Sequence, residues 1–575
     1  MIRKLPDSRR PASIIRIASA SLVLLFYLAI SPTEQRAAEP QVVDLSLLIS
    51  EDYPCTWPTD FPPFQIRHYK RIGPLSAYNS DVLTIDGNTG TQIDVPPHSI
   101  PRPGTNLPNA GPLGDMFTDK IPAWQFAGEA CVVDVGELLD TAPNGHSSLV
   151  QKEHIVAWEK QHRPLRFGDV VLLRSEYSDK YYKPFPEGRR FLADPVEGVA
   201  PAWPDPHPDC MEYLASRGVM AVGIDSPSMG PLPDLQEPTH IAGLRHGMIF
   251  TEGVTGLGQL PATGAFYCVL GPKHADGPYG EGRAFAISPG ALADRLIDAA
   301  RNKRAIDLSV RLSTDLPLTW TGRGAGNHHH PYLKADFMYA ANLDLYHHTH
   351  MLDSSLGTHL VPPSRALPAP GFDNANYSPQ VKDWLGEYDR QYGTRATSET
   401  TAADVPIEQT CGPARVIDVR RLLGTTDEKS WPASPEITPE VIKDYEKRHG
   451  ELQTGNVVVF YTGHSDRTFK PMPEGAACIA DPLNGRSEGW PAPGPDAVMY
   501  LAGRGVNCIA IDAPSLGGVE PKRALMTYWA LGGAGMVGVE FLTNVGEIPE
   551  DAYFLFAALK IAGCHGGPGR AIALY

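Results

Sequence analysis

The chain has 575 residues, of which 42% are hydrophobic, and it carries a formal net charge of -16 at pH 7. This length exceeds what one ordinary domain needs, and the hydrophobic fraction is enough for two cores, so we expect two domains. The negative charge repels phosphate backbones and anionic lipid headgroups, which argues against nucleic acid as a partner.

The amino-terminal residues have the pattern of an export signal. Four basic residues within the first ten positions precede an uncharged apolar run at residues 17–30. Since about twenty apolar residues are needed to cross a bilayer, this run favours a cleaved signal over a membrane anchor. We therefore predict a signal peptide over residues 1–38, export to a periplasm or out of the cell, and no stable membrane insertion after cleavage.

Most of the remaining sequence occurs twice. The segment PDCMEYLASRGVMAVGIDSPSMG, which starts at Pro208, returns without a gap as PDAVMYLAGRGVNCIAIDAPSLG, which starts at Pro495. Self-similarity of this length indicates a tandem duplication. We predict a first repeat over residues 39–302 and a second repeat over residues 303–575.

Each repeat alternates between apolar runs of strand length and helical stretches, which predicts a mixed α/β fold. The stretch 209–217 is one predicted helix, with Asp209 as its N-cap and an end at Gly218, before an apolar strand over residues 219–224. Asp496 is the matching N-cap in the second repeat.

An aspartate follows this strand in both repeats, at Asp225 and Asp512. Either carboxylate could be catalytic. The repeated Asp-x-Pro-Ser pattern is equally typical of a turn in which the side chain hydrogen-bonds to the backbone. Both interpretations remain open at the level of sequence.

The motif with the clearest chemistry is GNTGTQIDVPPH, residues 87–98. It places Asn88, Gln92, Asp94 and His98 at even spacing, so that in an extended backbone all four side chains could lie on one face. The double proline stiffens the turn that follows. Such a layout suits a metal site or a catalytic site.

This motif resembles the HxGTHxDxPxH signature of the metal-dependent cyclase family, which includes bacterial kynurenine formamidases and isatin hydrolases. Asn88 and Gln92 stand where that signature has its two ligating histidines. The resemblance covers nearly all of both repeats and implies an α/β domain of the swivelling β/β/α type for each. It also implies dimers or larger oligomers, so that the two fused units could form a pseudo-dimer and associate further. The positions that match the signature are Gly90, Thr91, Asp94, Pro96 and His98.

The same resemblance extends to His240 and Glu252, which with Asp94 complete a ligand set. Two carboxylates and an imidazole suit zinc, manganese or iron. The amide oxygens of Asn88 and Gln92 can ligate a hard cation but bind zinc less well than imidazole does. We therefore predict one divalent ion per chain, with manganese favoured and zinc as the alternative.

The second repeat lacks most of these ligands. Only His359 and Glu540 remain, which are too few for a tight site. We predict that the second repeat is structural, carries no chemistry and covers the first. Repeat alignment sets Ser355, His359, Val361 and Arg365 against Asn88, Gln92, Asp94 and His98, and Tyr528 and Glu540 against His240 and Glu252.

Other potential ligands are interpreted as structural. Histidines at residues 328–330 and 347–350 are dense enough to bind transition metals, but a polar loop with adventitious binding is favoured. The eight cysteines include no CxxC pair, and several sit in apolar runs, so buried thiols are favoured over disulfides or a zinc cluster.

The resemblance implies a hydrolase of an amide or cyclic amide, acting on carbon-nitrogen bonds other than peptide bonds, and the amino-terminal pattern predicts that it is exported. The resemblance implies that His98 is the proton carrier. It also implies a small aromatic substrate, and Trp57, Phe61, Phe64 and Trp124 could form the wall of its pocket, although aromatics at such positions more often lie in a core. The alternative is a non-catalytic ligand-binding or structural protein with decayed metal sites.

Overall fold

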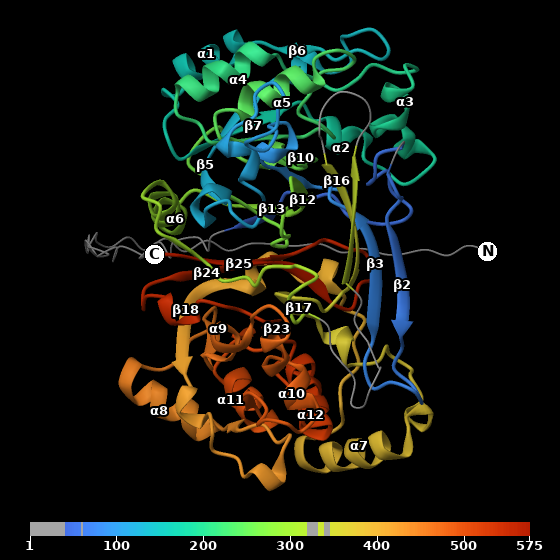
Figure 1. The fold of residues 1–575 in the computed structure, drawn as a ribbon, viewed down its shortest axis with the longest axis vertical. Coiled ribbons are helices and arrows are strands. Elements are labelled where there is room, and N and C mark those ends of the chain that lie inside the picture. The colour runs from blue at the N-terminus through green and yellow to red at the C-terminus, as the bar shows by residue number, and fades with distance from the viewer. Residues whose placement is uncertain (1–40, 59–60, 319–331, 339–345) are drawn as a thin grey trace, which may run out of the picture. The chain divides into compact units, whose positions relative to one another are not determined.

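The computed structural model describes residues 41–58, 61–318, 332–338 and 346–575 (Figure 1). The predicted signal peptide lies outside these residues, so cleavage and export remain predictions. Within the described ranges, no helix combines the length and the hydrophobicity that crossing a bilayer requires.

The first repeat is built on a mixed sheet of nine strands in the described residues. Its four central strands, β5, β7, β9 and β10, run parallel, and the flanking strands pair antiparallel. The parallel strands are apolar runs buried on both faces, which is why they read as continuous hydrophobic segments in the sequence. In sheet order the strands are β1 (Val42–Asp44), β13 (Arg283–Ile287), β11 (Phe266–Leu270), β5 (Ala127–Asp134), β7 (Asp169–Arg174), β9 (Ala221–Ile224), β10 (Ile249–Glu252), β4 (Gln92–Asp94) and β12 (Tyr279–Glu281).

The second repeat has a sheet of eight described strands, in which β18, β20, β22 and β23 are successive neighbours as β5, β7, β9 and β10 are in the first. One long strand, β25, takes the places of both β12 and β13, because it pairs with β17 as well as with β14 and β24. The mixed α/β prediction is therefore confirmed, whereas the swivelling β/β/α type stays a prediction. In sheet order the strands are β14 (Ala305–Asp307), β25 (Gly567–Leu574), β17 (His359–Val361), β23 (Val537–Glu540), β22 (Cys508–Ile511), β20 (Val457–Tyr461), β18 (Cys411–Asp418) and β24 (Tyr553–Ala558).

Five helices recur in both repeats, with α1 to α5 of the first matching α8 to α12 of the second, whereas α6 and α7 are each described in one repeat alone. The helices of the first repeat are α1 (Lys152–Gln161), α2 (Tyr177–Tyr181), α3 (Ala193–Val196), α4 (Pro208–Ser216), α5 (Gln236–Leu244) and α6 (Ala291–Arg301). The helices of the second repeat are α7 (Pro379–Tyr392), α8 (Pro439–His449), α9 (His464–Thr468), α10 (Ala480–Leu483), α11 (Pro495–Gly503) and α12 (Pro521–Gly533). The predicted repeat boundary falls in the turn between α6 and β14, and it remains a prediction.

The two predicted N-caps are wrong by two positions. Proline occupies the first helical position of both α4 and α11, a place its missing N–H and fixed φ favour, so the helices begin before the aspartates. His207 is the N-cap of α4, and its side chain accepts a hydrogen bond from the backbone of Asp209 at 3.2 Å. Gly494 is the N-cap of α11. Asp209 and Asp496 instead lie in the first turn, where a carboxylate favours the helix dipole.

A four-stranded antiparallel sheet combines strands of both repeats. Its order is β15 (Tyr332–Met338), β16 (Tyr346–Asp353), β3 (Ser80–Asp86) and β2 (Gln65–Lys70). Strand β16 of the second repeat runs beside β3 of the first, from Thr349 opposite Asp86 to Asp353 opposite Val82 (Figure 1). A strand of the second repeat therefore lies directly next to the segment that enters the 87–98 motif.

The prediction of a polar loop for the second group of histidines is wrong. His348 and His350 lie on β16 and are fully buried. They are buried because the strand pairs with β3 and packs against the first repeat, a long-range contact that local polarity does not reveal. Residues 328–330 and the side chain at position 347 lie outside the described part.

The hydrophobic core is shared between the repeats. One cluster of buried side chains joins Phe266 and Phe285 of the first sheet with Leu555 and Ile572 of the second. All eight cysteines are buried free thiols, which confirms the prediction made for them. Because the halves bury apolar surface against one another, each depends on the other for its stability.

Candidate metal centre

Strand β4 carries the first half of the 87–98 motif into the sheet. It pairs with β10 so that Gln92 lies opposite Glu252 and Asp94 opposite Phe250. Gly90 has a φ of 70°, which glycine adopts without strain, and this conformation allows the sharp entry into the strand. Gln92 and Asp94, two residues apart, therefore face the same side of the sheet.

The other candidate residues come from a turn and a helix. The 3-10 turn Pro96–His98 follows β4, and its prolines fix the backbone that presents His98. Helix α5 presents His240, which has a buried side chain. Strand, turn and helix thus bring together residues that are far apart in the sequence.

The donor atoms converge on one point. The Nε2 atom of His240 lies 3.5 Å from Oδ2 of Asp94 and 3.4 Å from Oε1 of Glu252. The Nε2 atom of His98 lies 3.9 Å from the same oxygen of Asp94. Asp94, His98 and His240 can each place one ligand atom within 4.8 Å of the others.

Protein contacts orient two of these ligands. The Nδ1 atom of His240 donates to the Gln236 carbonyl at 2.8 Å, which leaves Nε2 facing the carboxylates. Glu252 accepts hydrogen bonds from the Met229 backbone at 2.5 Å and from the Gln92 amide at 2.6 Å. Gln92 therefore braces Glu252, and a ligand role for its oxygen stays a prediction.

Asn88 is placed differently. It is buried in the turn between β3 and β4, where its backbone N–H donates to Asp86 at 2.9 Å. Its role as a ligand also stays a prediction.

Burial and mutual charge perturb the titration of the cluster. Burial raises the pKa of Glu252 to about 8, and the neighbouring Asp94 charge adds to the effect. Burial opposes the charged form of Asp94, but His98 and His240 outweigh it and hold its pKa below the ordinary value. Burial lowers the pKa of His98 to about 4. Burial opposes the charged form of His240, but Asp94 and Glu252 outweigh it and raise its pKa well above the ordinary value. The two carboxyl groups therefore attract a positive charge into a water-poor site, and a proton or a metal ion can supply that charge.

The residues fit a divalent metal ion. Among the residues that the structure describes, neither carboxylate oxygen of Asp94 accepts a hydrogen bond, although the side chain is fully buried. A buried carboxylate without a partner is costly, and a cation removes that cost. Two donors about 2.1 Å from one ion at a tetrahedral angle are about 3.4 Å apart, close to the separations around His240. His98 could serve as a fourth ligand or stand beside the ion.

The matching place in the second repeat is closed by protein contacts. The Nε2 atom of His359 lies 3.2 Å from Glu540, and the Tyr528 hydroxyl donates to the same carboxylate at 2.6 Å. Val361 occupies the position of Asp94 in the strand and is buried. The ring of Tyr78, from the first repeat, packs edge-on against Tyr528 at 5.9 Å.

A second group of potential ligands, His68, Asp81 and His565, joins the two repeats. The Nδ1 atoms of His68 and His565 lie 2.7 and 3.0 Å from Asp81, and the backbone N–H of His565 donates to it at 2.6 Å. These are hydrogen-bond lengths, shorter than the separation of two ligands on a shared ion. The Arg71 guanidinium, 3.2 Å from the His565 ring, also opposes a cation. This group is a hydrogen-bonded clamp.

Asp225 and Asp512 lie outside the site. Asp225 accepts hydrogen bonds from the backbone of Ser175 at 2.8 Å and of Glu176 at 2.6 Å, in the turn that follows β7. Asp512 makes the equivalent bonds in the second repeat. The structure therefore supports the interpretation of these residues as turn residues.

Three of the four aromatic residues considered for a pocket wall have described packing partners. Phe64 is buried in an apolar cluster with Leu83 and Ile85. Trp57 packs on Trp203 with ring centroids 6.4 Å apart. Trp124 packs on Phe167 at 5.4 Å. Phe64 therefore has the core role, whereas Trp57 and Trp124 are only partly buried and their place in a pocket wall stays a prediction.

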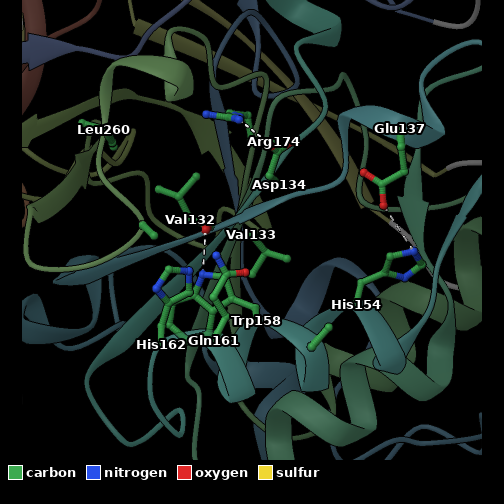
Figure 2. A pocket seen from close by; sticks show the side chains of 12 residues that line it. Val132, Val133, Asp134, Glu137, His154, Trp158, Gln161, His162, Arg174 and Leu260 are labelled. Atoms are coloured by element: carbon green, nitrogen blue, oxygen red, sulfur yellow. Dashed lines mark hydrogen bonds and ion pairs between the residues drawn. The ribbon is translucent and has the colours of Figure 1, made fainter.

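A surface pocket of about 430 Å³ lies beside β5 and α1, and none of the candidate ligands lines it (Figure 2). Figure 2 shows Glu137 and His154 turned toward one another, 3.8 Å apart, and the indole N–H of Trp158 bound to a carbonyl of β5. A pocket of about 520 Å³ lined by Tyr445 occupies the matching place in the second repeat. These pockets recur with the fold and do not mark the metal centre.

Two residues beside the centre were not predicted to lie there: Tyr279 was not singled out in the sequence, and His348 was assigned to a polar loop. Tyr279 packs edge-on against His98 with ring centroids 5.0 Å apart, and His348 contacts Tyr279. Neither position belongs to the motif. Only the pairing of β12 with β4 and of β16 with β3 brings them to the site.

Two buried carboxylates and two imidazoles on a mixed α/β frame define a candidate metal-binding protein. The family model described as "Putative cyclase" matches residues 43–231 and 306–517, more than half of the chain. The protein therefore belongs to the cyclase family, and both repeats carry the family pattern.

The protein is similar to characterised members of the family. Over 170 residues it is 34% identical to the isatin hydrolase of Roseibium aggregatum, a match that spans 28% of this chain and 62% of that protein, less than two thirds of its length. Over 221 residues it is 29% identical to the kynurenine formamidase of Salinibacter ruber, covering 37% of this chain and 82% of that one. Isatin hydrolase A from Labrenzia aggregata, solved bound to benzyl benzoate, matches 44% of this chain and 94% of its own at 23% identity, with a TM-score of 0.37.

Proposed function

We propose that the protein is a metal-dependent hydrolase of an amide or a cyclic amide. One divalent ion, with manganese favoured over zinc, would be held by Asp94, His240 and Glu252. The observation that carries this proposal is the buried Asp94 carboxylate, which accepts no hydrogen bond from any described residue and faces an imidazole and a second carboxylate. The similarity to an isatin hydrolase and to kynurenine formamidases supports the reaction class.

The proposed reaction is the cleavage of a carbon-nitrogen bond by water, in which the carbon gains the hydroxyl group and the nitrogen gains a proton. When bound, the ion supplies Lewis acidity, which polarises a carbonyl group and lowers the pKa of water. His98 is neutral at pH 7, so a ring nitrogen can accept the proton of water and pass it to the leaving nitrogen. Asp94, 3.9 Å from the His98 ring, stabilises the charged form of that ring while it holds the proton.

Metal analysis and a substrate screen test the proposal. Purified protein, incubated with Mn²⁺ or Zn²⁺ and then desalted, should retain about one ion per chain. It should hydrolyse isatin, formanilide or another small aromatic amide in a panel of amides, lactams and esters. Protein that retains no ion and turns over none of the panel would favour the alternative of a non-catalytic binding or structural protein.

His98→Ala tests the role of the proton carrier. Loss of general acid-base catalysis should lower turnover by about a hundredfold to ten-thousandfold while metal content and melting temperature stay near those of the wild type. If the ion is lost with the imidazole, His98 is a ligand. If the rate per folded molecule is unchanged, the proposed proton transfer is wrong.

We also propose that the mature protein is exported and that its two repeats act as a pseudo-dimer within one chain. Cell fractionation with amino-terminal sequencing tests export, since a signal peptide would be absent from the mature protein. Light scattering after size-exclusion chromatography tests whether single chains associate further.

A further inference from the structure

We propose that the second repeat helps to build the site of the first: His348 of β16 fixes Tyr279, and Tyr279 positions the ring of His98. Tyr279 is therefore a positioning residue that acts through His98. The kinetic part of the test rests on the proposed function, and the labelling part does not.

Tyr279 lies against both His98 and the strand that carries Asp94. In the pairing of β12 with β4, Tyr279 is the direct partner of Asp94. Its ring is fully buried and meets the His98 ring edge-on, with centroids 5.0 Å apart and planes at 87°. An edge-to-face contact of this kind is favourable and directional.

Hydrogen bonds do little to orient His98. Among the described residues, its Nδ1 atom has no hydrogen-bond partner although it is buried. Its Nε2 atom lies 3.9 Å from Asp94, beyond hydrogen-bond distance. The contacts of its ring with Tyr279 at 5.0 Å and His240 at 5.2 Å therefore define its orientation.

His348 holds Tyr279 at two points. The His348 backbone N–H donates to the Tyr279 hydroxyl at 3.1 Å. Its Nε2 atom lies 2.9 Å from the Tyr279 carbonyl, which can only accept, so the imidazole donates there. The hydroxyl and the backbone of Tyr279 are thus gripped by one residue of the other repeat.

The surroundings leave the Tyr279 ring little room to move. A Cβ atom at Gly87 would lie 2.5 Å from the Tyr279 ring and 2.8 Å from the His348 imidazole, so only glycine fits there. The Gly87 backbone N–H also donates to the His348 carbonyl at 3.2 Å. Gly87, the first residue of the 87–98 motif, is thereby packed against both Tyr279 and His348.

Neighbouring contacts anchor β16 itself. The Thr349 hydroxyl donates to Asp86 at 3.0 Å. The His350 ring stacks on His274 at 3.9 Å, and His274 lies 3.0 Å from Glu281. Because His348 stands between these anchored residues, it cannot shift without breaking contacts on both sides.

The kinetic test compares two substitutions at position 348 in the metal-loaded full chain. His348→Ala removes the imidazole donor and should lower kcat for a substrate from the panel by about tenfold to hundredfold, the cost of misplacing a catalytic group by roughly 1 Å. KM and metal content should stay within about twofold. His348→Gln, whose amide can still donate to the Tyr279 carbonyl, should restore kcat to within a few-fold of the wild type.

The labelling test needs no turnover. Diethyl pyrocarbonate acylates a neutral imidazole nitrogen, and mass spectrometry of the peptide that contains His98 measures the rate. His348→Ala and Tyr279→Phe should raise that rate several-fold over the wild type at matched metal content, because the ring is less restrained. Tyr279→Phe keeps the ring and removes only the hydroxyl that His348 grips.

His68→Ala is the matched control. It removes one contact of the His68–Asp81–His565 clamp, which joins the repeats away from His98. It should change neither kcat nor the labelling of His98. Unchanged labelling of His98 in both His348→Ala and Tyr279→Phe would overturn the inference, and equal increases in His68→Ala would show that any loosening of the repeats has the same effect. If the wild type turns over no substrate, the labelling result alone decides.

Discussion

The two repeats share one frame and differ in what fills it. In both, a short strand pairs with a neighbouring strand that ends in a glutamate, and a helix faces the pair. In the first repeat the strand carries Asp94 and the helix His240, whereas the second repeat has Val361 and Tyr528 at these places. The shared arrangement of strands and helix therefore forms with or without the metal ligands, and metal binding depends on a few side chains that this arrangement positions.

Both repeats have a glutamate at the end of the neighbouring strand, Glu252 in the first and Glu540 in the second, and the contacts of the two glutamates differ. Glu252 accepts a backbone hydrogen bond from Met229, and Glu540 accepts the equivalent bond from Leu516. Glu540 also accepts a bond from the Tyr528 hydroxyl and lies 3.2 Å from His359. Its charge is satisfied by these protein groups, whereas Asp94 accepts no hydrogen bond from a described residue and has only longer ion-pair contacts, 3.5 Å to His240 and 3.9 Å to His98. The lack of hydrogen bonds to a buried carboxylate is thus what separates the two sites.

The largest expected effect comes from removing the Asp94 carboxylate, which accepts no hydrogen bond from a described residue. Asp94→Asn should reduce the retained ion to less than about a tenth per chain and lower turnover by about a thousandfold or more, since the anionic ligand is lost. His359→Gln places in the second repeat the residue that the first has at Gln92, and it should leave both quantities unchanged. Metal analysis and kinetics on both proteins check the comparison. Loss of the ion in His359→Gln would show that the second site is the occupied one.

Restoring the missing ligands should restore the second site. Val361→Asp combined with Tyr528→His should raise metal content from about one to about two ions per chain, because His359 and Glu540 already stand in register. The new site should bind the ion more weakly than the first, because Arg365 stands where the first repeat has His98 and its positive charge repels a cation. Its guanidinium lies 5.6 Å from the ring of Tyr78, which packs against Tyr528. Metal titration of the purified variant measures this. Val361→Asp alone is the control: the Tyr528 hydroxyl still donates to Glu540 at 2.6 Å and competes with an ion for that ligand, so the single variant should bind the second ion more weakly than the double variant.

The second repeat has a histidine, His464, where the first has Tyr177, and only the histidine can bind a proton as the pH falls. Tyr177 donates to the Phe191 carbonyl at 2.9 Å, and His464, its counterpart, makes the same bond to Cys478 at 2.8 Å. Burial lowers the pKa of His464 to about 4 from an ordinary value of 6.5. Between these values the unfolded state binds more protons, so stability falls as the pH drops from 6.5 toward 4.

His464→Gln should remove this contribution, because an amide can donate the same bond without titrating. The loss of unfolding free energy between pH 7 and pH 4 should be smaller in the variant by about 3 kcal/mol. Chemical denaturation of both proteins at the two pH values measures the difference. Parallel pH dependences would mean that the pKa of His464 is the same in the folded and the unfolded state.

The smallest effect concerns the altered ligand of the first repeat. Gln92→His should tighten metal binding by about tenfold, or about 1.4 kcal/mol, because imidazole is a stronger ligand than an amide. His359 shows that an imidazole fits opposite the paired glutamate. Competition with a chelator measures the affinity. Weaker binding would mean that the hydrogen bond from Gln92 to Glu252 matters more than an added ligand.

Much of the fold could be predicted because its signals are local. The apolar strand over residues 219–224, the helix over residues 209–217 and its end at Gly218 follow from hydrophobic periodicity and glycine conformation, and the observed helix α4 spans Pro208–Ser216. The N-cap at Asp209 was wrong because a proline at the first helical position outweighs a good capping side chain. The assignment of His348 and His350 to a polar loop failed because strand pairing with the other repeat buries them.

The sequence by itself determined that the chain is duplicated and that its units are mixed α/β. It also identified Asp94, His98, His240 and Glu252 as the candidate site residues. The duplication follows from self-similarity, the α/β class from hydrophobic periodicity, and the four residues from the resemblance to the cyclase family. Only the tertiary structure decided that Asp94 lacks a hydrogen-bond partner among the described residues, that Gln92 braces Glu252 and that a strand of the second repeat reaches Tyr279. The physical reason is that burial and satisfaction of polar atoms depend on contacts between segments hundreds of residues apart, which no local pattern encodes.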